Sequence, residues 1–209
     1  PGAHRITARV TDAAGGVGQD LVDISLVTAG TVTTQRRIDV GADDVEERVS
    51  DGRMTIDSSD LELIYDSRDQ LVGLRFTGVA VPRAARILDA YLQFKVDEVS
   101  IGATTLNVQV EASDDAAPFA STARSVSLRP RTLTSVSWTP NPWPTVKAIG
   151  LDQRSPSLVS VIQPVIDRAG WASGNDLALI ITGAGARVAE AFEGDAGGAP
   201  LLVIEYDVP

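Results

Sequence analysis

The sequence predicts an all-β fold: an antiparallel β-sandwich of the jelly-roll kind with one short helix, preceded by a β-hairpin. Three observations support this prediction. Many short β-branched runs are separated by Gly, Pro, Asn and Asp, which is typical of sandwiches and jelly rolls. Only one stretch has the apolar spacing of an amphipathic helix. The composition, 44% hydrophobic and 22% charged, is that of a globular protein.

The first 28 residues have the pattern of a hairpin. Apolar and polar positions alternate over 4–10 and again over 20–26, and a Gly-rich turn at 12–16 separates the two runs. A two-stranded sheet is marginally stable in water at best. We therefore expect this hairpin to pack against another surface, in this chain or in another one.

A Thr-, Gly- and Ala-rich segment at 29–35 is expected to be a linker. The β-sandwich module then runs from 36 to 209. Its short β-branched runs predict strands at 37–40, 61–65, 72–77, 87–96, 105–112, 135–138, 177–182, 188–192 and 201–206. The Gly-rich segment 183–185 is expected to be a hairpin turn between the strands on either side of it.

One helix is expected between 155 and 170. Ser155 followed by Pro156 suits a helix N-terminus, because proline at the first helical position has no N–H to leave unpaired. Gly170 is the expected end. Pro164 lies inside the pattern, where proline costs about 3 kcal/mol, so we expect a kink or an early end there. Apolar residues follow one another at helical spacing: Leu158, Val161, Ile162, Val165 and Ile166.

Composition limits the possible functions. The chain has no cysteine, which excludes disulfides, Cys-ligated zinc and a thiol nucleophile. His4 is the single histidine, which excludes a multi-histidine metal site. The net charge of −10 argues against nucleic acid, because binding phosphates needs clustered Lys and Arg. No apolar run approaches the length of a transmembrane helix, so we expect no membrane insertion.

The hairpin resembles the last two strands of a bacterial immunoglobulin-like repeat of the cadherin or PKD kind. The resemblance rests on I-T-x-x-V-x-D over 6–12, then a Gly turn and D-x-V-x-I over 20–24. Two interpretations follow. The hairpin is either the end of a neighbouring repeat or a strand pair that completes another subunit's sheet by strand addition.

The second unit resembles DNRLRE-type carbohydrate-binding modules over residues 43–206. The shared features are P-x-x-A-x-I-x-x-A-Y-L-x-F over 82–94, V-x-W over 136–138, G-N-x-L-x-L-I-I over 174–181 and P-L-L-x-I-E-Y over 200–206. This resemblance implies a non-catalytic β-sandwich, often containing calcium, in secreted or cell-surface proteins.

Clusters of acidic residues predict a structural Ca²⁺ site. Calcium takes six to eight oxygen ligands from carboxylates, carbonyls and water, which acidic loops supply. No cluster has the EF-hand spacing, and a solvated acidic face with turn Asp residues is the alternative. The expected ligands, the last of them resting on the resemblance, are Asp43, Asp44 and Glu46 with Asp60 or Glu62 and Glu193.

Exposed aromatic rings are the expected sugar contacts. Trp143 lies in a Pro-rich loop and is the best candidate, followed by Phe119 and Tyr65. Arg129 belongs to a small basic patch that is either a solvated loop or a docking point for an anionic sugar. Aromatic residues are only 5% of the chain, which argues against a broad stacking platform.

The leading hypothesis is therefore a non-catalytic extracellular module that binds polysaccharide or a cell-surface glycan, with Ca²⁺ fixing its loops. Catalysis would need two carboxylates facing each other across a cleft, which a sequence cannot show. The alternative is a structural module of a surface protein or filament, which self-assembles when its hairpin completes a neighbour's sheet.

Overall fold

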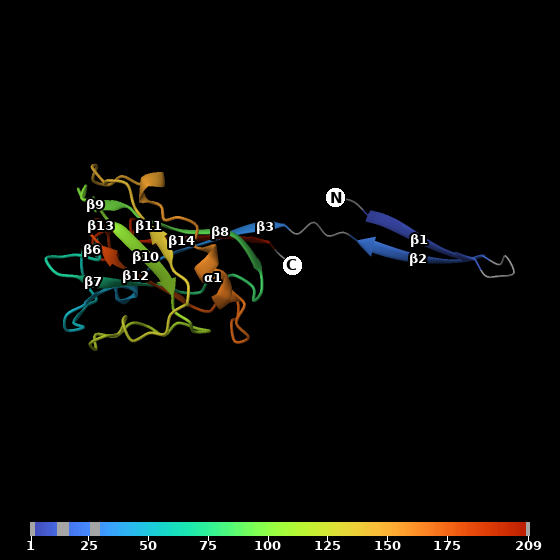
Figure 1. Ribbon diagram of the computed structural model, residues 1–209, viewed down its shortest axis with the longest axis horizontal. Coiled ribbons are helices and arrows are strands. Elements are labelled where there is room, and N and C mark those ends of the chain that lie inside the picture. Colours follow the sequence, from blue (N-terminus) through green and yellow to red (C-terminus); the bar gives the residue numbers. More distant parts are fainter. Residues whose placement is uncertain (1–2, 12–16, 26–29, 208–209) are drawn as a thin grey trace. The chain divides into compact units, whose positions relative to one another are not determined.

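The computed structural model describes residues 3–11, 17–25 and 30–207, which form two units with a boundary at Gly30. The first unit is a hairpin in which β1 (Ala3–Thr11) pairs antiparallel with β2 (Val17–Ser25) (Figure 1). The turn predicted at 12–16 and the segment 26–29 lie outside the described residues.

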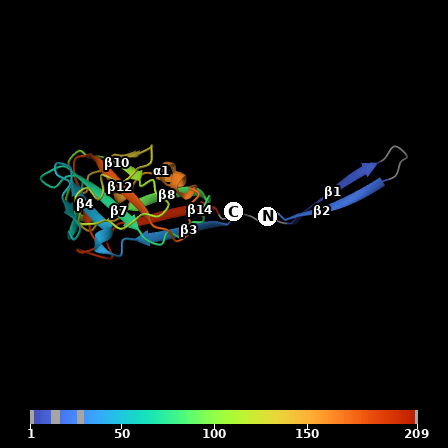
Figure 2. The ribbon, with the colours of Figure 1, turned by 90° about the horizontal axis from the view of Figure 1, so that it is seen from below.

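The second unit confirms the predicted all-β sandwich. Its strands are β3 (Thr31–Arg37), β4 (Asp44–Arg48), β5 (Met54–Thr55), β6 (Asp60–Leu63), β7 (Gln70–Phe76), β8 (Arg86–Gln93), β9 (Val96–Glu98), β10 (Thr105–Val110), β11 (Val136–Trp138), β12 (Leu177–Ala184), β13 (Arg187–Glu190) and β14 (Leu201–Asp207). One sheet has the order β11-β10-β12-β7-β4-β5, and two smaller sheets have the orders β3-β14-β8 and β6-β13-β9. All strand pairs between 31 and 207 are antiparallel (Figure 2).

Both faces of the six-stranded sheet are covered. On one face, Val108 of β10 and Leu179 of β12 share the main core with Leu92 of β8. On the other face, a long segment between β10 and β11 folds over the sheet and forms a smaller core with Ile180. This double burial explains why β12 is a continuous apolar run rather than an alternating one.

Most predicted strands are present, with two instructive differences at the start of the module. Residues 31–37 form β3 instead of continuing a linker, because they pair with β14 along their whole length. The short strand β4 was not predicted. Val45 is its one apolar residue, yet four of its five residues are buried.

The helix is shorter than expected and begins later. α1 spans Val159–Ile166 and packs against β8 and β10. Ser155 is not its N-cap, because its backbone N–H and hydroxyl instead hydrogen-bond the backbone of Leu92. Pro164 lies inside the helix, and the Ser160 carbonyl that its missing N–H leaves unpaired accepts a bond from the Thr134 hydroxyl. Among the described residues, no helix has the length and apolarity needed to span a membrane.

The segment 183–185 is not a hairpin turn. β12 pairs with β10 and β7, whereas β13 pairs with β6 and β9, so this segment connects two sheets. Gly185 has a φ of +95°, and a Cβ at this position would lie 2.3 Å from the carbonyl oxygen of Ala103. Glycine is therefore needed here for its conformation and for the close approach of the backbone.

Candidate functional site

The expected exposure of Trp143 is wrong, because its side chain is fully buried. The indole packs with Phe94 and Trp138, with both ring centroids 6.4 Å away. Its Nε1–H donates to the backbone oxygen of Asp152 at 2.9 Å. The Pro-rich loop turns inward here because the backbone of Trp143 exchanges two hydrogen bonds with Ser100.

Phe119 and Arg129 are likewise committed to the fold. Phe119 is 5% exposed, and a Cβ at Gly73 would lie 2.6 Å from its ring. The Arg129 guanidinium lies 4.0 Å above this ring and pairs with Glu111. It also donates to the backbone oxygens of Ser125 and Pro118. Neither side chain is available to a ligand, so both expectations are corrected.

Tyr65 is the one expected ligand contact that is exposed, at 47%. It lines a shallow groove of about 600 Å³, here called the Tyr65 groove. The other residues of the groove are Asp69, Val99, Ser100, Gly102, Ala103, Gly185, Ala186 and Val188. The groove thus combines one exposed ring with mostly small side chains and exposed backbone.

The six expected calcium ligands do not form one site. Asp43 is buried and accepts two hydrogen bonds from Arg75, at 2.9 and 3.0 Å. Arg75 also pairs with Asp176 and donates to the backbone oxygen of Ala116. Asp43 is therefore a structural ion-pair partner, and its assignment as a calcium ligand is corrected.

Glu46 and Glu62 form a carboxyl pair. The Oε1 atom of Glu46 accepts hydrogen bonds from the Glu62 backbone at 2.8 Å and from Gln70 at 2.9 Å. Burial, with the neighbouring Glu62, raises the pKa of Glu46 well above its usual range. The pair thus holds a proton at neutral pH.

Asp44 and Glu193 come from distant parts of the chain and meet beside Gly41. The Oδ2 atom of Asp44 accepts a hydrogen bond from the Phe192 backbone at 2.8 Å. A Cβ at Gly41 would lie 1.4 Å from the Oε1 atom of Glu193. Glu193 thus lies near enough to Asp44 for its negative charge to help raise the pKa of Asp44, although burial is the main cause.

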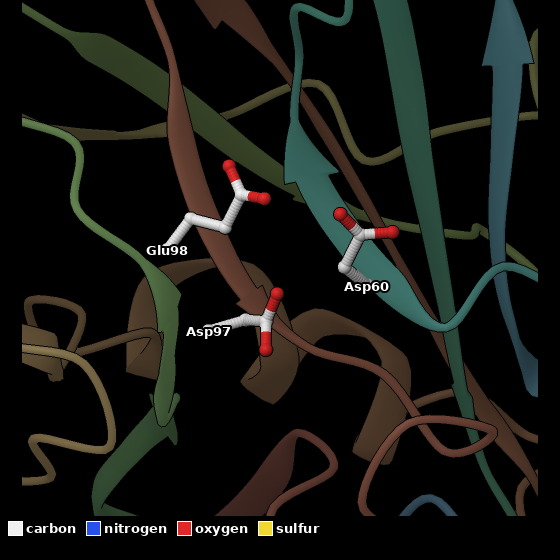
Figure 3. Close-up of side chains that lie close together, drawn as sticks. All are labelled: Asp60, Asp97 and Glu98. Carbon is white, nitrogen blue, oxygen red and sulfur yellow. The ribbon is translucent and has the colours of Figure 1, made fainter.

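Asp60 belongs to a different group, formed with Asp97 and Glu98 and here called the acidic edge. One carboxylate oxygen of each residue lies within 4.8 Å of the others. Figure 3 shows the three side chains around a common space. The acidic edge is the one group of three or more potential metal ligands among the described residues.

A β-bulge in β9 builds the acidic edge. Glu98 lies opposite Val188, whereas Val96 lies opposite the next residue, Ala189. Asp97 is the extra residue between them. Consecutive residues of a regular strand point to opposite faces, and a bulge re-aims one of them. This irregularity lets Asp97 and Glu98 reach the same space.

Lys95 lies near enough to the acidic edge to act on Asp97, but it already pairs with other carboxylates. Lys95 pairs with Asp195 and lies 3.5 Å from a carboxylate oxygen of Glu190. Burial, followed by repulsion from Asp60, raises the pKa of Asp97. Three carboxylate groups that offer oxygen ligands only are suited to a hard cation such as Ca²⁺.

The Tyr65 groove adjoins the acidic edge and has a rigid wall. Val188 lines the groove and pairs with Glu98 of the edge. The neighbouring Arg187 is 1% exposed. Its guanidinium donates to Thr104 and to four backbone oxygens, those of Gly102, Pro140, Asn141 and Ala186. These bonds tie together the loops that border the groove.

No protein-family model matches the chain, and no curated protein matches it. The resemblance to DNRLRE-type modules therefore remains a prediction. The calcium ligands predicted from the sequence did not include two members of the acidic edge, Asp97 and Glu98. The acidic dipeptide at a strand end was a visible signal, but its meeting with Asp60 depends on a bulge that the sequence does not indicate.

Proposed function

We propose that the second unit is a non-catalytic extracellular module that binds polysaccharide or a cell-surface glycan, with Ca²⁺ bound at the acidic edge. The observation that carries the proposal is the position of the Tyr65 groove directly beside this edge. An exposed ring can stack on the C–H face of a sugar, and the adjoining backbone and Asp69 can hydrogen-bond its hydroxyl groups.

Calcium would act by preorganising the groove. The residues after Glu98 continue directly into its wall, through Val99 and Ser100. A cation held by β6 and β9 would fix this wall before the ligand arrives. Loops that are ordered in advance lose less entropy on binding, which strengthens the affinity.

The geometry of the carboxyl pair supports a non-catalytic role. Glycosidases hold their two carboxyl groups about 5–5.5 Å or about 6.5–9.5 Å apart, so that sugar or water fits between them. Glu46 is instead buried, and its Oε1 atom already accepts hydrogen bonds from the Glu62 backbone and from Gln70. They stabilise the contact between β4 and β6.

The experiment is a polysaccharide-binding screen with the full chain, first in CaCl₂ and then in EGTA. For a glycan that binds, Tyr65→Ala should weaken affinity about tenfold, the loss of roughly one stacking contact. Leu133→Ala is the matched control, because it removes another exposed apolar side chain outside the groove. Equal binding by wild type and Tyr65→Ala, or no binding across the panel, would overturn the proposal.

A second candidate function is assembly through the hairpin. The observation in its favour is that β1 and β2 form a two-stranded unit of their own, although such a sheet is marginally stable in isolation. Light scattering tests it, by comparing the full chain with a chain lacking residues 1–28. Oligomers that disappear on deletion would favour assembly over glycan binding, and a monomer in both cases would reject it.

A further inference from the structure

A second groove, of about 350 Å³ and here called the Leu133 groove, lies beside α1 near the end of β10. One side is the segment 131–134, and the other includes Pro164 and Val165 of α1. None of its lining residues belongs to the Tyr65 groove or to the acidic edge. Its volume is at the lower end of the range for small-molecule sites, so it suits a small ligand.

Hydrogen bonds hold both sides of the Leu133 groove in place. The backbone N–H of Thr132 donates to the Val110 oxygen at 2.9 Å, and its hydroxyl accepts from the Val110 N–H at 3.2 Å. The Thr134 hydroxyl donates to the Ser160 oxygen, the carbonyl that Pro164 leaves free. A proline inside the helix and the residue that compensates for it thus both line the groove. A groove that is formed in advance loses less entropy when a ligand binds.

The Leu133 groove joins buried and exposed apolar side chains. Val165 is buried, whereas the Leu133 side chain is fully exposed and Pro164 is exposed as well. Single exposed leucines are common on protein surfaces. Leu133, however, faces water at a concave site with apolar residues on the opposite side, so a ligand there would remove apolar surface from water.

Both charged residues that line the groove are arginines, although the net charge of the chain is −10. Arg168 pairs with Asp114 through its Nε atom, and the two side chains are 39% and 44% exposed. Water screens such an exposed pair, which makes it weak. The two terminal nitrogens of Arg168 lie outside this contact, so they are available to a second anion.

Arg131 is partly buried, and no ion pair among residues 30–207 involves it. Burial lowers its pKa, and the carboxylate that acts on it is that of Glu47. Glu47 already accepts hydrogen bonds from the backbone N–H groups of Val126 and Ser127, both at 2.8 Å. A partly buried positive charge without a paired anion is unfavourable, so an anionic ligand would stabilise it.

We propose that the Leu133 groove binds a small free carboxylic acid with an apolar body. The hydrocarbon part covers Leu133 and Pro164, and the carboxylate pairs with Arg168 and Arg131. A guanidinium and a carboxylate match each other in two parallel hydrogen bonds. This site does not depend on the proposed glycan function, and Leu133→Ala is thus a test of this groove and a control for the Tyr65 groove.

The hydroxyl groups of the groove favour a carboxylate over a phosphate. Thr132 donates its hydroxyl hydrogen to the backbone oxygen of Thr134, and Thr134 donates its own to Ser160. Neither hydroxyl therefore has a hydrogen left to donate to a ligand. A phosphate has more charge and more acceptor oxygens to satisfy than these two arginines and an apolar lining provide.

The test is an NMR titration of the full chain at pH 7 with octanoate, 1-octanol and acetate, following backbone amide signals of 131–134. Octanoate should shift these signals with a Kd on the order of a few millimolar. 1-Octanol lacks the charge and acetate lacks the apolar body, so each should bind at least about tenfold more weakly.

Two variants separate the apolar contact from the charged one. Leu133→Ala should weaken octanoate binding about fivefold, and Arg168→Gln about tenfold, while Arg168→Gln leaves the weak binding of 1-octanol unchanged. Leu128→Ala is the matched control, because Leu128 is 76% exposed and lies outside the groove. The side chains of Leu133 and Arg168 are not buried, so these variants remain folded even if Arg131→Gln does not.

Four results would overturn the inference. The first is an absence of shifts at about ten times the expected Kd, and the second is octanoate binding that neither Leu133→Ala nor Arg168→Gln weakens. The third is 1-octanol that binds as tightly as octanoate, which would mean that the groove is only an apolar surface. The fourth is tighter binding of N-acetyl-leucine than of octanoate, which would assign the groove to the C-terminus of a peptide.

Discussion

Asp43 and Asp44 are consecutive carboxylates with the same 3% exposure, but they have opposite surroundings. Asp43 lies on the face of the six-stranded sheet that carries Arg75, which neutralises it with two hydrogen bonds. Asp44 lies opposite Leu74 of β7 and meets the loop after β13, where Glu193 is a second negative group. One residue along the chain thus separates a carboxylate that pairs with an arginine from one that has no Lys or Arg partner among the described residues.

The difference lies in whether the fold supplies the counter-charge. Where an arginine is built in, the carboxylate stabilises the fold and binds nothing further. Where it is not, as at Asp44, a bound proton or an external cation is needed to offset the burial of the carboxylate. Acidic content alone cannot distinguish these cases, because it does not show whether a buried carboxylate has a positively charged partner.

The largest effect is expected from Arg75→Met. This change leaves Asp43 buried without its partner and removes the ion pair of Asp176. Breaking a buried pair from one side costs about 3–5 kcal/mol. Urea unfolding should show this loss of stability, while Arg86→Met, a 79% exposed partner of Asp207, should change it by less than about 0.5 kcal/mol. A small loss in Arg75→Met would mean that the pairing is not what stabilises Asp43.

Arg187→Lys tests a buried positive charge that is stabilised by hydrogen bonds to backbone oxygens, not by pairing with carboxylates. Lysine keeps the charge but has three donors, so at least two of the oxygens that Arg187 binds lose their partner. Each unsatisfied group costs about 1 kcal/mol or more, which gives an expected loss of about 2–3 kcal/mol. Chemical denaturation measures it. Stability equal to wild type would show that charge alone matters at this position.

These buried charges also explain which parts of the fold were predictable. Strands with alternating or continuous apolar runs, such as β12 and β14, were located from the sequence because burial selects their pattern. β4 was missed because its buried face carries Asp44 and Glu46, whose tolerance depends on partners far along the chain. Trp143 was placed at the surface because its flanking prolines resemble an exposed loop.

The candidate site was predictable only in part. Asp60 was identified, but its partners come from β9, whose bulge is set by pairing with β13 some ninety residues later. Likewise, Asp44 and Glu193 were grouped with Glu46, although strand geometry assigns them to different neighbours. Residue types at the site follow from the sequence, whereas their grouping follows from the register of the sheets.

Glu46→Gln tests whether Glu46 is protonated in the folded chain, through the pH dependence of its stability. Because the pKa of Glu46 is raised in the folded state, the folded chain holds an extra proton above about pH 4.3, the usual pKa of Glu. Stability is therefore greatest below that pH and falls by about 1.4 kcal/mol per unit as pH rises toward the folded pKa. The glutamine amide can donate to Glu62 without titrating, so its variant should lack this part of the slope. Urea unfolding between pH 5 and 8 in EGTA provides the measurement, and an unchanged slope would contradict the raised pKa of Glu46.

The smallest effect is expected from Asp97→Asn. Whether this change stabilises or destabilises the fold in each buffer shows whether a cation is bound. In EGTA the change removes one negative charge from the acidic edge and relieves repulsion from Asp60, which should stabilise the fold by about 0.5 kcal/mol. In CaCl₂ the same change removes a ligand, so the variant should be less stable than wild type. Thermal melts in both buffers measure the two differences. A reversal of sign places a cation at the edge, whereas the same stabilisation in both buffers would mean that these three carboxylates are simply an exposed acidic surface.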